Sequence, residues 1–466
     1  MFVSNINYIR YILLIVVFIQ LSCGYAMAIE DVTVQNHSKT KKTVTTQTES
    51  PKLVTSINFD KVLEAAREHS YDLKMADFNI LISKQDVRAA KSEYWPKLIA
   101  NAGTEYTKNF RENKEATVMS IADSFINPYT RFQSVIGINL TYNLFDFGIR
   151  RGRLNIAKED VTLKELEEEK QWQDLKLNLV DTYCKLLVIK KQIDIYSQML
   201  PIAEKNLNYK ERLFKAKEIS KMEVNTQAVD LDTIKNRLSE LNSMYAENLE
   251  WLSFYTGESY DKDKLQIADF KKSNFDVNAF KDYTKSITWL IYEQQIKKKE
   301  LELSVVKKTN YPKINAYSRY YFYGSDKNNF GTSLSDFGPS NFSVGASMNM
   351  MLFDGMKNRA NIQKTYLELQ KLNVERDKAI AQFMSRLAVM RTNLIYLNEQ
   401  VANNEDIVAQ LTDKEKSFHR LVSKRLSSPI EENDAKIEML KQKIELEKNK
   451  TTSAAITKGI EILTNY

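Results

Sequence analysis

The 466-residue chain has 12 glycines and 7 prolines, where average usage would give roughly 33 and roughly 23, so few residues are available to form turns. With 43% hydrophobic and 27% charged residues, it favours a small number of very long helices over a Rossmann domain, TIM barrel or large β-sandwich. The 67 basic residues are interleaved with 60 acidic ones, which gives nucleic-acid binding no support, and the two cysteines and three histidines show no metal-ligand spacing.

The first residues have the pattern of an export signal. Arg10 precedes an unbroken apolar run at 11–19, and Ala26-Met27-Ala28 is a small-x-small cleavage site. A run of that length spans only about 14 Å as a helix, against a bilayer core of about 30 Å, so a transmembrane anchor is the weaker alternative. We therefore predict a signal peptide over 1–28 and a disordered leader over 29–56, with lipid attachment at Cys23 as an open alternative.

The rest of the chain consists of two copies of one unit. An offset of 208 superimposes these landmarks: Gly137 on Gly345, Leu144-Phe145-Asp146 on Leu352-Phe353-Asp354, Arg212-Leu213 on Arg420-Leu421, and Ser220-x-x-Glu223 on Ser428-x-x-Glu431. An offset of 216 superimposes Tyr94-Trp95-Pro96-Lys97 on Asn310-Tyr311-Pro312-Lys313. We predict a first repeat over 57–256, a connector over 257–276 and a second repeat over 277–466.

Each repeat is predicted to run helix, strand, strand, long helix, return helix. The entering helices cover about 60–94 and about 277–310, because the proline that follows each one ends it. The first strands cover about 97–107 and 313–323, and the long helices carry heptad seams that indicate helix packing. Ser220 with Glu223, and Ser428 with Glu431, predict capping boxes at the starts of the return helices.

The second strand of each repeat alternates apolar residues with small polar ones. The apolar positions predicted to face lipid are Ile138, Leu140, Tyr142, Met348 and Met350. The alternative is an ordinary amphipathic sheet packed on helices, but the helices are already engaged through their own seams. Four membrane strands cannot close around a lumen, so the chain must oligomerise, and the residues themselves leave three or four copies open.

The chain resembles the TolC-like outer-membrane efflux proteins over about Phe59 to Leu463. The resemblance lies in the order of these elements, in the strand ends and capped turns, and in the strand starts Trp95-Pro96-Lys97-Leu98 and Tyr311-Pro312-Lys313-Ile314. The resemblance implies a mainly α fold with a small β part. It implies a homotrimer whose 12 strands form one β-barrel in outer-membrane lipid, continued by a periplasmic coiled-coil tunnel. It further implies the exit duct of a tripartite efflux or type I secretion system, working with a periplasmic adaptor and an inner-membrane transporter, without catalysis or cofactors.

The resemblance also assigns sites. The helical tips that would meet the adaptor contain Arg212, Leu213, Ser220, Glu223, Arg420, Leu421 and Ser428. Glu431 and Asp434, three apart on one helix face, fall where family members narrow the entrance. In the alternative interpretation, Glu431 only caps the helix and Asp434 is a solvated side chain. Neither tip has the glycine that family turns usually carry before the cap, which leaves adaptor recognition open.

Two other classes of function were weighed against the duct. An exported coiled-coil tether of the cell envelope explains the heptads but leaves the alternating strands unexplained. An enzyme is disfavoured because the sequence has no G-x-S-x-G, H-E-x-x-H or phosphate-loop pattern. Whether the exported substrate is a small molecule or a polypeptide, and which pump is used, stays open.

Overall fold

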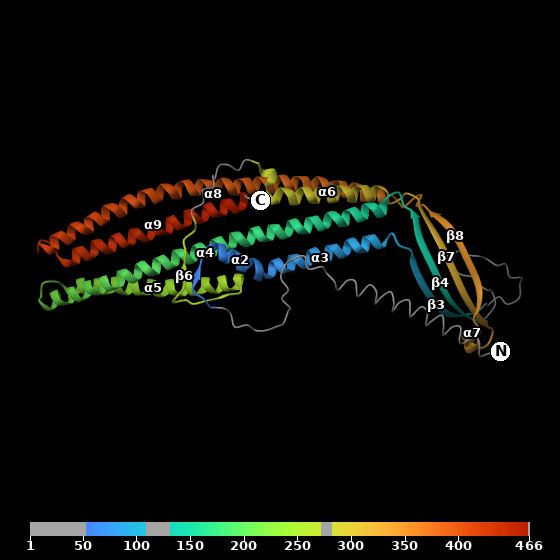
Figure 1. Ribbon diagram of the computed structural model, residues 1–466, viewed down its shortest axis with the longest axis horizontal. Helices are drawn as coiled ribbons and strands as arrows, with labels where there is room; N and C mark the ends of the chain where they lie inside the picture. The colour runs from blue at the N-terminus through green and yellow to red at the C-terminus, as the bar shows by residue number, and fades with distance from the viewer. Residues whose placement is uncertain (1–52, 109–130, 272–281, 465–466) are drawn as a thin grey trace. The chain divides into compact units, whose positions relative to one another are not determined.

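The computed structural model describes residues 53–108, 131–271 and 282–464, and it is mostly helical with a small sheet, which confirms the mainly α composition with a small β part (Figure 1). Its elements are, in chain order, β1 (Leu53–Val54), β2 (Ser56–Ile57), α2 (Phe59–His69), α3 (Tyr71–Ser92), β3 (Lys97–Thr107), β4 (Arg131–Phe145), α4 (Ile149–Lys215), α5 (Lys221–Thr256), β5 (Ser259–Tyr260), β6 (Gln266–Ile267), the 3-10 turn η1 (Tyr283–Lys285), α6 (Ile287–Lys307), β7 (Lys313–Asp326), α7 (Phe330–Ser335), β8 (Gly338–Asn349), α8 (Lys357–Ser423) and α9 (Pro429–Thr464).

The described residues divide into two compact units. The sheet unit contains Arg88–Leu154 and Ser304–Asn361, and the helix unit contains the described parts of Glu49–Val87, Asn155–Leu303 and Ile362–Tyr466. Among the described helices, none combines the length and the apolarity needed to cross a membrane.

The duplication is visible in the helix bounds. α4 and α8 each contain 67 residues, and α5 and α9 each contain 36. α8 and α9 begin and end 208 positions after α4 and α5, the offset found in the sequence. Two copies of one sequence pattern therefore fold into the same local structure.

The entering helices differ from the prediction. A single helix over 60–94 is wrong, because Ser70 breaks it into α2 and α3. The Ser70 N–H donates to Ala66 O at 2.9 Å, while its hydroxyl accepts from Leu73 N at 3.4 Å and caps the next helix. In the second copy Ser286, 216 positions later, accepts from Trp289 N at 3.3 Å, so α6 starts at Ile287 rather than near 277.

The segment before the first repeat also needs a correction. The end of the predicted leader, from residue 53 to 56, contributes to two short strands instead of being disordered. β1 pairs in parallel with β5, and β2 with β6, both in the predicted connector. The Tyr183 hydroxyl on α4 donates to Ala268 O at 2.6 Å and fastens the connector to the helices. The predicted signal peptide and the leader up to residue 52 lie outside the described residues.

The core of the helix unit confirms the first heptad seam. Leu179, Leu186 and Ala203 on α4 are fully buried, and Leu241 and Leu252 on α5 are fully buried as well. Burying a leucine side chain stabilises a fold by about 1.5–3 kcal/mol, so this seam contributes strongly.

The four longer strands form one antiparallel sheet in the order β3-β4-β7-β8 (Figure 1). Its register brings most apolar positions of the four strands to one face, in rows such as Leu98, Leu140, Ser318 and Val344, whereas Ile99 and Val135 lie on the other face. The alternation read from the sequence is thus confirmed for Ile138, Leu140, Tyr142 and Met348 as members of one face. Val344 and Met348 are 74% and 66% exposed, so this face is open in a single chain.

Met350 is an exception, because β8 ends at Asn349. Asn349 pairs with Lys313, and the residue before Lys313 is Pro312, which has no N–H to donate to a neighbouring strand. Met350 therefore lies one residue beyond the sheet, and its prediction as a strand residue is wrong.

Candidate functional site

The second face of the sheet is polar and aromatic. It carries Tyr317, Arg319 and Tyr321 on β7, beside Gly137 on β4 and Gly345 on β8. A Cβ added at Gly137 would lie 2.3 Å from the Tyr321 ring, and one at Gly345 would lie 2.7 Å from the Tyr317 hydroxyl. The two repeated glycines thus make room for the tyrosines of β7, a role that the sequence alone did not show.

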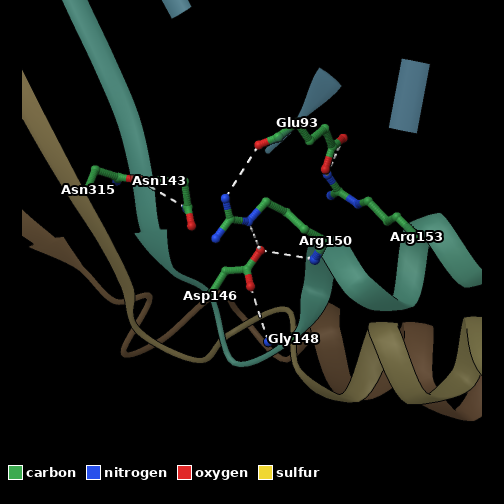
Figure 2. Close-up of polar contacts among 7 residues, drawn as sticks. All are labelled: Glu93, Asn143, Asp146, Gly148, Arg150, Arg153 and Asn315. Carbon is green, nitrogen blue, oxygen red and sulfur yellow. Dashed lines mark hydrogen bonds and ion pairs between the residues drawn. The ribbon is translucent and has the colours of Figure 1, made fainter. Parts of the chain in front are cut away.

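At the end of β4, Asp146 caps the long helix α4 (Figure 2). Its carboxylate accepts from Gly148 N at 3.1 Å and from Arg150 N at 3.0 Å, and it also pairs with the Arg150 guanidinium. Phe147 and Gly148 adopt left-handed conformations, with φ of 55° and 83°. The Leu-Phe-Asp pattern therefore encodes a sharp strand-to-helix turn with its own cap.

Charged groups attach this turn to the end of α3 (Figure 2). Arg150 donates to Glu93 O at 3.5 Å, and Arg153 pairs with the Glu93 carboxylate at 3.1 Å. The Arg150 guanidinium also lies 5.0 Å from the centre of the Tyr94 ring. The incoming and outgoing helices of the first copy are thereby held together where they meet the sheet.

The second copy has the same turn with neutral partners. Asp354 accepts from Asn358 N at 2.9 Å and from the Asn310 side chain at 3.4 Å, and Gly355 and Met356 are left-handed. The backbone N–H of Asn358 lowers the pKa of the Asp354 carboxyl. The capping aspartate is thus common to both copies, whereas the ion pairs belong to the first.

The predicted adaptor-docking residues lie at the two helical tips of the helix unit. Arg212 and Leu213 are in the last turn of α4, Arg420 and Leu421 are in the last turn of α8, and Ser220 forms the predicted capping box with Glu223. Each tip closes through a left-handed residue, Lys217 with φ 64° or Arg425 with φ 60°. Glu218 N bonds to Leu213 O, and Leu426 N to Leu421 O, which completes the usual C-terminal motif without its glycine.

The two predicted constriction residues have separate partners. The Glu431 carboxylate accepts from the Ser427 hydroxyl and from Ser428 N, and these bonds lower its pKa. The Ser428 hydroxyl accepts from Ile430 N at 3.2 Å, so the cap is present with one bond shifted from the predicted box.

Asp434 accepts from the Asn206 side chain on α4 at 2.8 Å, and Asn433 donates to the same Asn206 at 2.7 Å. Asp434 is exposed as a residue, yet its carboxyl is partly desolvated where it meets α4, which raises its pKa. Asn206 is fully buried, and the sequence analysis missed it because an isolated asparagine beside a heptad seam gives no signal.

Within the described part of the chain, no group of three or more histidine, cysteine, aspartate or glutamate side chains could hold a metal ion. Cys184 on α4 is a free thiol, and burial raises its pKa to about 11.

Residues 62–258 match the family described as outer membrane efflux protein. No curated protein matches the chain. The CmeC outer membrane channel of Campylobacter jejuni has a TM-score of 0.72 at 14% identity, covering 87% of this chain and 85% of that chain. The outer membrane protein VceC of Vibrio cholerae has 0.71 at 14% identity, covering 87% and 96%, and CusC has 0.70 at 13% identity, covering 86% and 91%.

Identities this low show a common fold and no more. The family match and the common fold nevertheless confirm the resemblance seen in the sequence: residues 62–258 carry the pattern of the outer membrane efflux protein family, and the chain as a whole has the fold of the outer-membrane channels to which it is similar.

Proposed function

We propose that this protein is the outer-membrane exit duct of a tripartite efflux or type I secretion system. It works as a homotrimer with a periplasmic adaptor and an inner-membrane transporter, and it is a passive channel rather than an enzyme. Its sheet lies in the outer membrane and its helices extend into the periplasm. The family of the matched segment supports this function.

The observation that carries the proposal is the sheet with two unlike faces and two open edges. One face is apolar and exposed, and the other carries tyrosines, asparagines and glycines. The outer edges of β3 and β8 have no partner within the described residues. Long unpaired edges can pair with another chain, so three copies joined β8 to β3 would close a barrel of 12 strands with lipid outside and water inside.

Cell fractionation followed by electrophoresis without boiling tests this function. An outer-membrane band that runs as a trimer and collapses to a monomer on heating is expected. A soluble or inner-membrane monomer would instead support the alternative, an exported coiled-coil tether.

The assignment of the two faces has its own test. Leu140→Arg places a cation on the lipid face, which costs roughly 2 to 4 kcal/mol near the bilayer midplane, so the trimer should fail to assemble. The neighbouring change Asn139→Glu places a charge on the polar face, directly across from Arg319, and should leave the trimer intact with altered conductance. Equal damage from both changes would mean that the two faces are assigned the wrong way or that neither meets lipid.

We further propose that Glu431 and Asp434 form acidic rings at the periplasmic entrance. Threefold symmetry would gather three copies of each near the axis, which favours cations. Trivalent cations should block the current of the reconstituted channel, and Asp434→Ala should weaken the block. Glu223→Ala is the matched control, because Glu223 caps the first return helix and has Thr226 rather than an acid three residues later. Equal block in wild type and the double Glu431 and Asp434 variant would refute the rings.

The tips are proposed as the contact with the adaptor. Lys217 and Arg425 stand at the left-handed positions of both tips, where they are exposed. A partner that fits them would present acidic groups. Reversing both charges to glutamate should abolish export while the trimer still forms, and unchanged export would argue against docking at the tips.

A further inference from the structure

The polar face of the sheet carries a positive charge excess. Among its described side chains, the basic ones are Lys97 on β3 with Lys313 and Arg319 on β7, and the acidic one is Glu105 on β3. The other described side chains of this face are neutral, mostly asparagine, serine, threonine, tyrosine and glycine. The described side chains of one chain therefore contribute three basic groups and one acidic group to this face.

Arg319 occupies the middle of the face. β7 is an inner strand, and the residues directly opposite Arg319 in the register of the sheet are Asn139 on β4 and Ser343 on β8. Its guanidinium lies 4.7 Å from the centre of the Tyr317 ring, which confirms that both side chains lie on the same face. Lys97 and Lys313, by contrast, stand at the first positions of their strands, about 20 Å along the strand from Arg319 in the case of Lys313.

The surroundings of Arg319 suit a flat organic anion. A guanidinium binds a carboxylate or sulfonate through paired N–H bonds, and an adjacent tyrosine ring offers a surface on which an aromatic ring can stack. The glycines at 137 and 345 allow the Tyr321 and Tyr317 rings to lie over the neighbouring strands. Tyrosine and arginine thus alternate along β7, from Tyr317 through Arg319 to Tyr321.

We propose that Arg319 is a specificity-determining residue of the duct, forming a ring that favours small organic anions, aromatic carboxylates or sulfonates in particular, in the outer-membrane part of the lumen. This inference rests on the proposed function. Rings of arginine or lysine select anions in pores through their charge.

Planar-bilayer recording of the purified trimer in a KCl gradient tests the inference. Three guanidinium charges about 10 Å from the axis, screened over about 8 Å, should favour chloride and disfavour potassium by a similar factor, and so raise the chloride-to-potassium permeability ratio roughly threefold over the neutral variant Arg319→Gln. Arg319→Lys keeps the charge and should keep the ratio, and Arg319→Glu should lower it further. All these variants retain Glu431 and Asp434, so a difference in permeability ratio between them reports on the sheet.

Two additional measurements keep the test decisive. Ser343→Glu places an acid directly across from Arg319 and should lower the ratio even if Arg319→Gln does not assemble. Lys371→Gln on α8 removes one exposed charge elsewhere and should leave the ratio unchanged. With benzenesulfonate as the probe, the half-blocking concentration should rise severalfold in Arg319→Gln and by a smaller factor in Arg319→Lys, which keeps the charge but loses the paired N–H bonds.

The outcomes separate the two proposals. A wild-type protein that forms no trimer and no channel would refute the duct itself. A working channel whose permeability ratio and benzenesulfonate block are the same in wild type, Arg319→Gln and Ser343→Glu would refute the role of Arg319 and leave the duct standing.

Discussion

Replacing Gly137 by alanine should destabilise the sheet through a contact that the structure locates. The new Cβ would lie 2.3 Å from Cδ1 and 2.4 Å from Cε1 of the Tyr321 ring, which belongs to its direct cross-strand partner. Contacts shorter than 3.0 Å are not tolerated, so the ring or the strand must move. Overpacking of this kind costs typically about 1–3 kcal/mol, and a trimer incurs it in each chain.

Two other glycines provide a graded series. At Gly345 the close atoms are the hydroxyl and Cζ of Tyr317, at 2.7 and 2.9 Å, and the tip of a side chain can shift more easily. At Gly103 the nearest side-chain atom is Val135 Cγ1 at 3.9 Å, an ordinary contact. The expected loss of stability is therefore largest for Gly137→Ala, smaller for Gly345→Ala and absent for Gly103→Ala.

The assay is the temperature at which the trimer band converts to monomer in detergent electrophoresis. Adding Tyr321→Ser to Gly137→Ala should restore much of the lost stability, because it removes the ring that the methyl group meets, and such non-additivity is characteristic of contacting residues. Equal losses at Gly103 and Gly137, or a double variant as unstable as the sum of its parts, would refute the reasoning.

Three further outcomes are expected. Lys217→Gly and Arg425→Gly relieve left-handed backbone and should each stabilise a tip by about 1 kcal/mol, measured as slower proteolysis there, whereas faster cleavage would contradict the strain. Because the pKa of Glu431 is lower in the folded state than its ordinary value, the ionised carboxylate stabilises the start of α9 above the ordinary pKa, and this stabilisation is lost as the pH falls through the folded-state pKa. Hydrogen exchange at the start of α9, corrected for intrinsic rates, should show that loss in the wild type but not in Glu431→Gln. Cys184, with a pKa raised to about 11, should react with iodoacetamide at neutral pH far more slowly than in urea, and equal rates would mean that it is accessible.

Local signals in the sequence located most of the elements. The strand predicted at 97–107 is β3 to the residue, because Pro96 fixes its start and the entering helix cannot continue past that proline. The long helices and return helices are bounded by an aspartate cap or a serine cap, and those caps act within one helical turn. The repeat offset then carried each assignment from the first copy to the second.

Other features depended on partners far away in the chain. The break at Ser70 could not be read from apolar periodicity, which continues across it, because one serine that ends one helix and caps the next looks like any polar helix residue. Similarly, Asp434 contacts Asn206 because α9 packs against α4. A heptad seam indicates that a helix packs against another helix, but it does not identify that helix.

The sequence by itself determined the duplication, the class of the long elements that the two copies share and the faces of β4 and β8, since caps, prolines and two-residue alternation act over a few neighbouring positions. Only the tertiary structure decided the faces of β7, where Tyr317, Tyr320, Tyr321 and Tyr323 are all amphipathic and alternation is lost. Pairing with β4 and β8 sets those rings, placing Tyr317 and Tyr321 against glycines on the polar face and Tyr320 among the apolar rows. A tyrosine satisfies either environment, so its face is fixed by the strands beside it and not by its own chemistry.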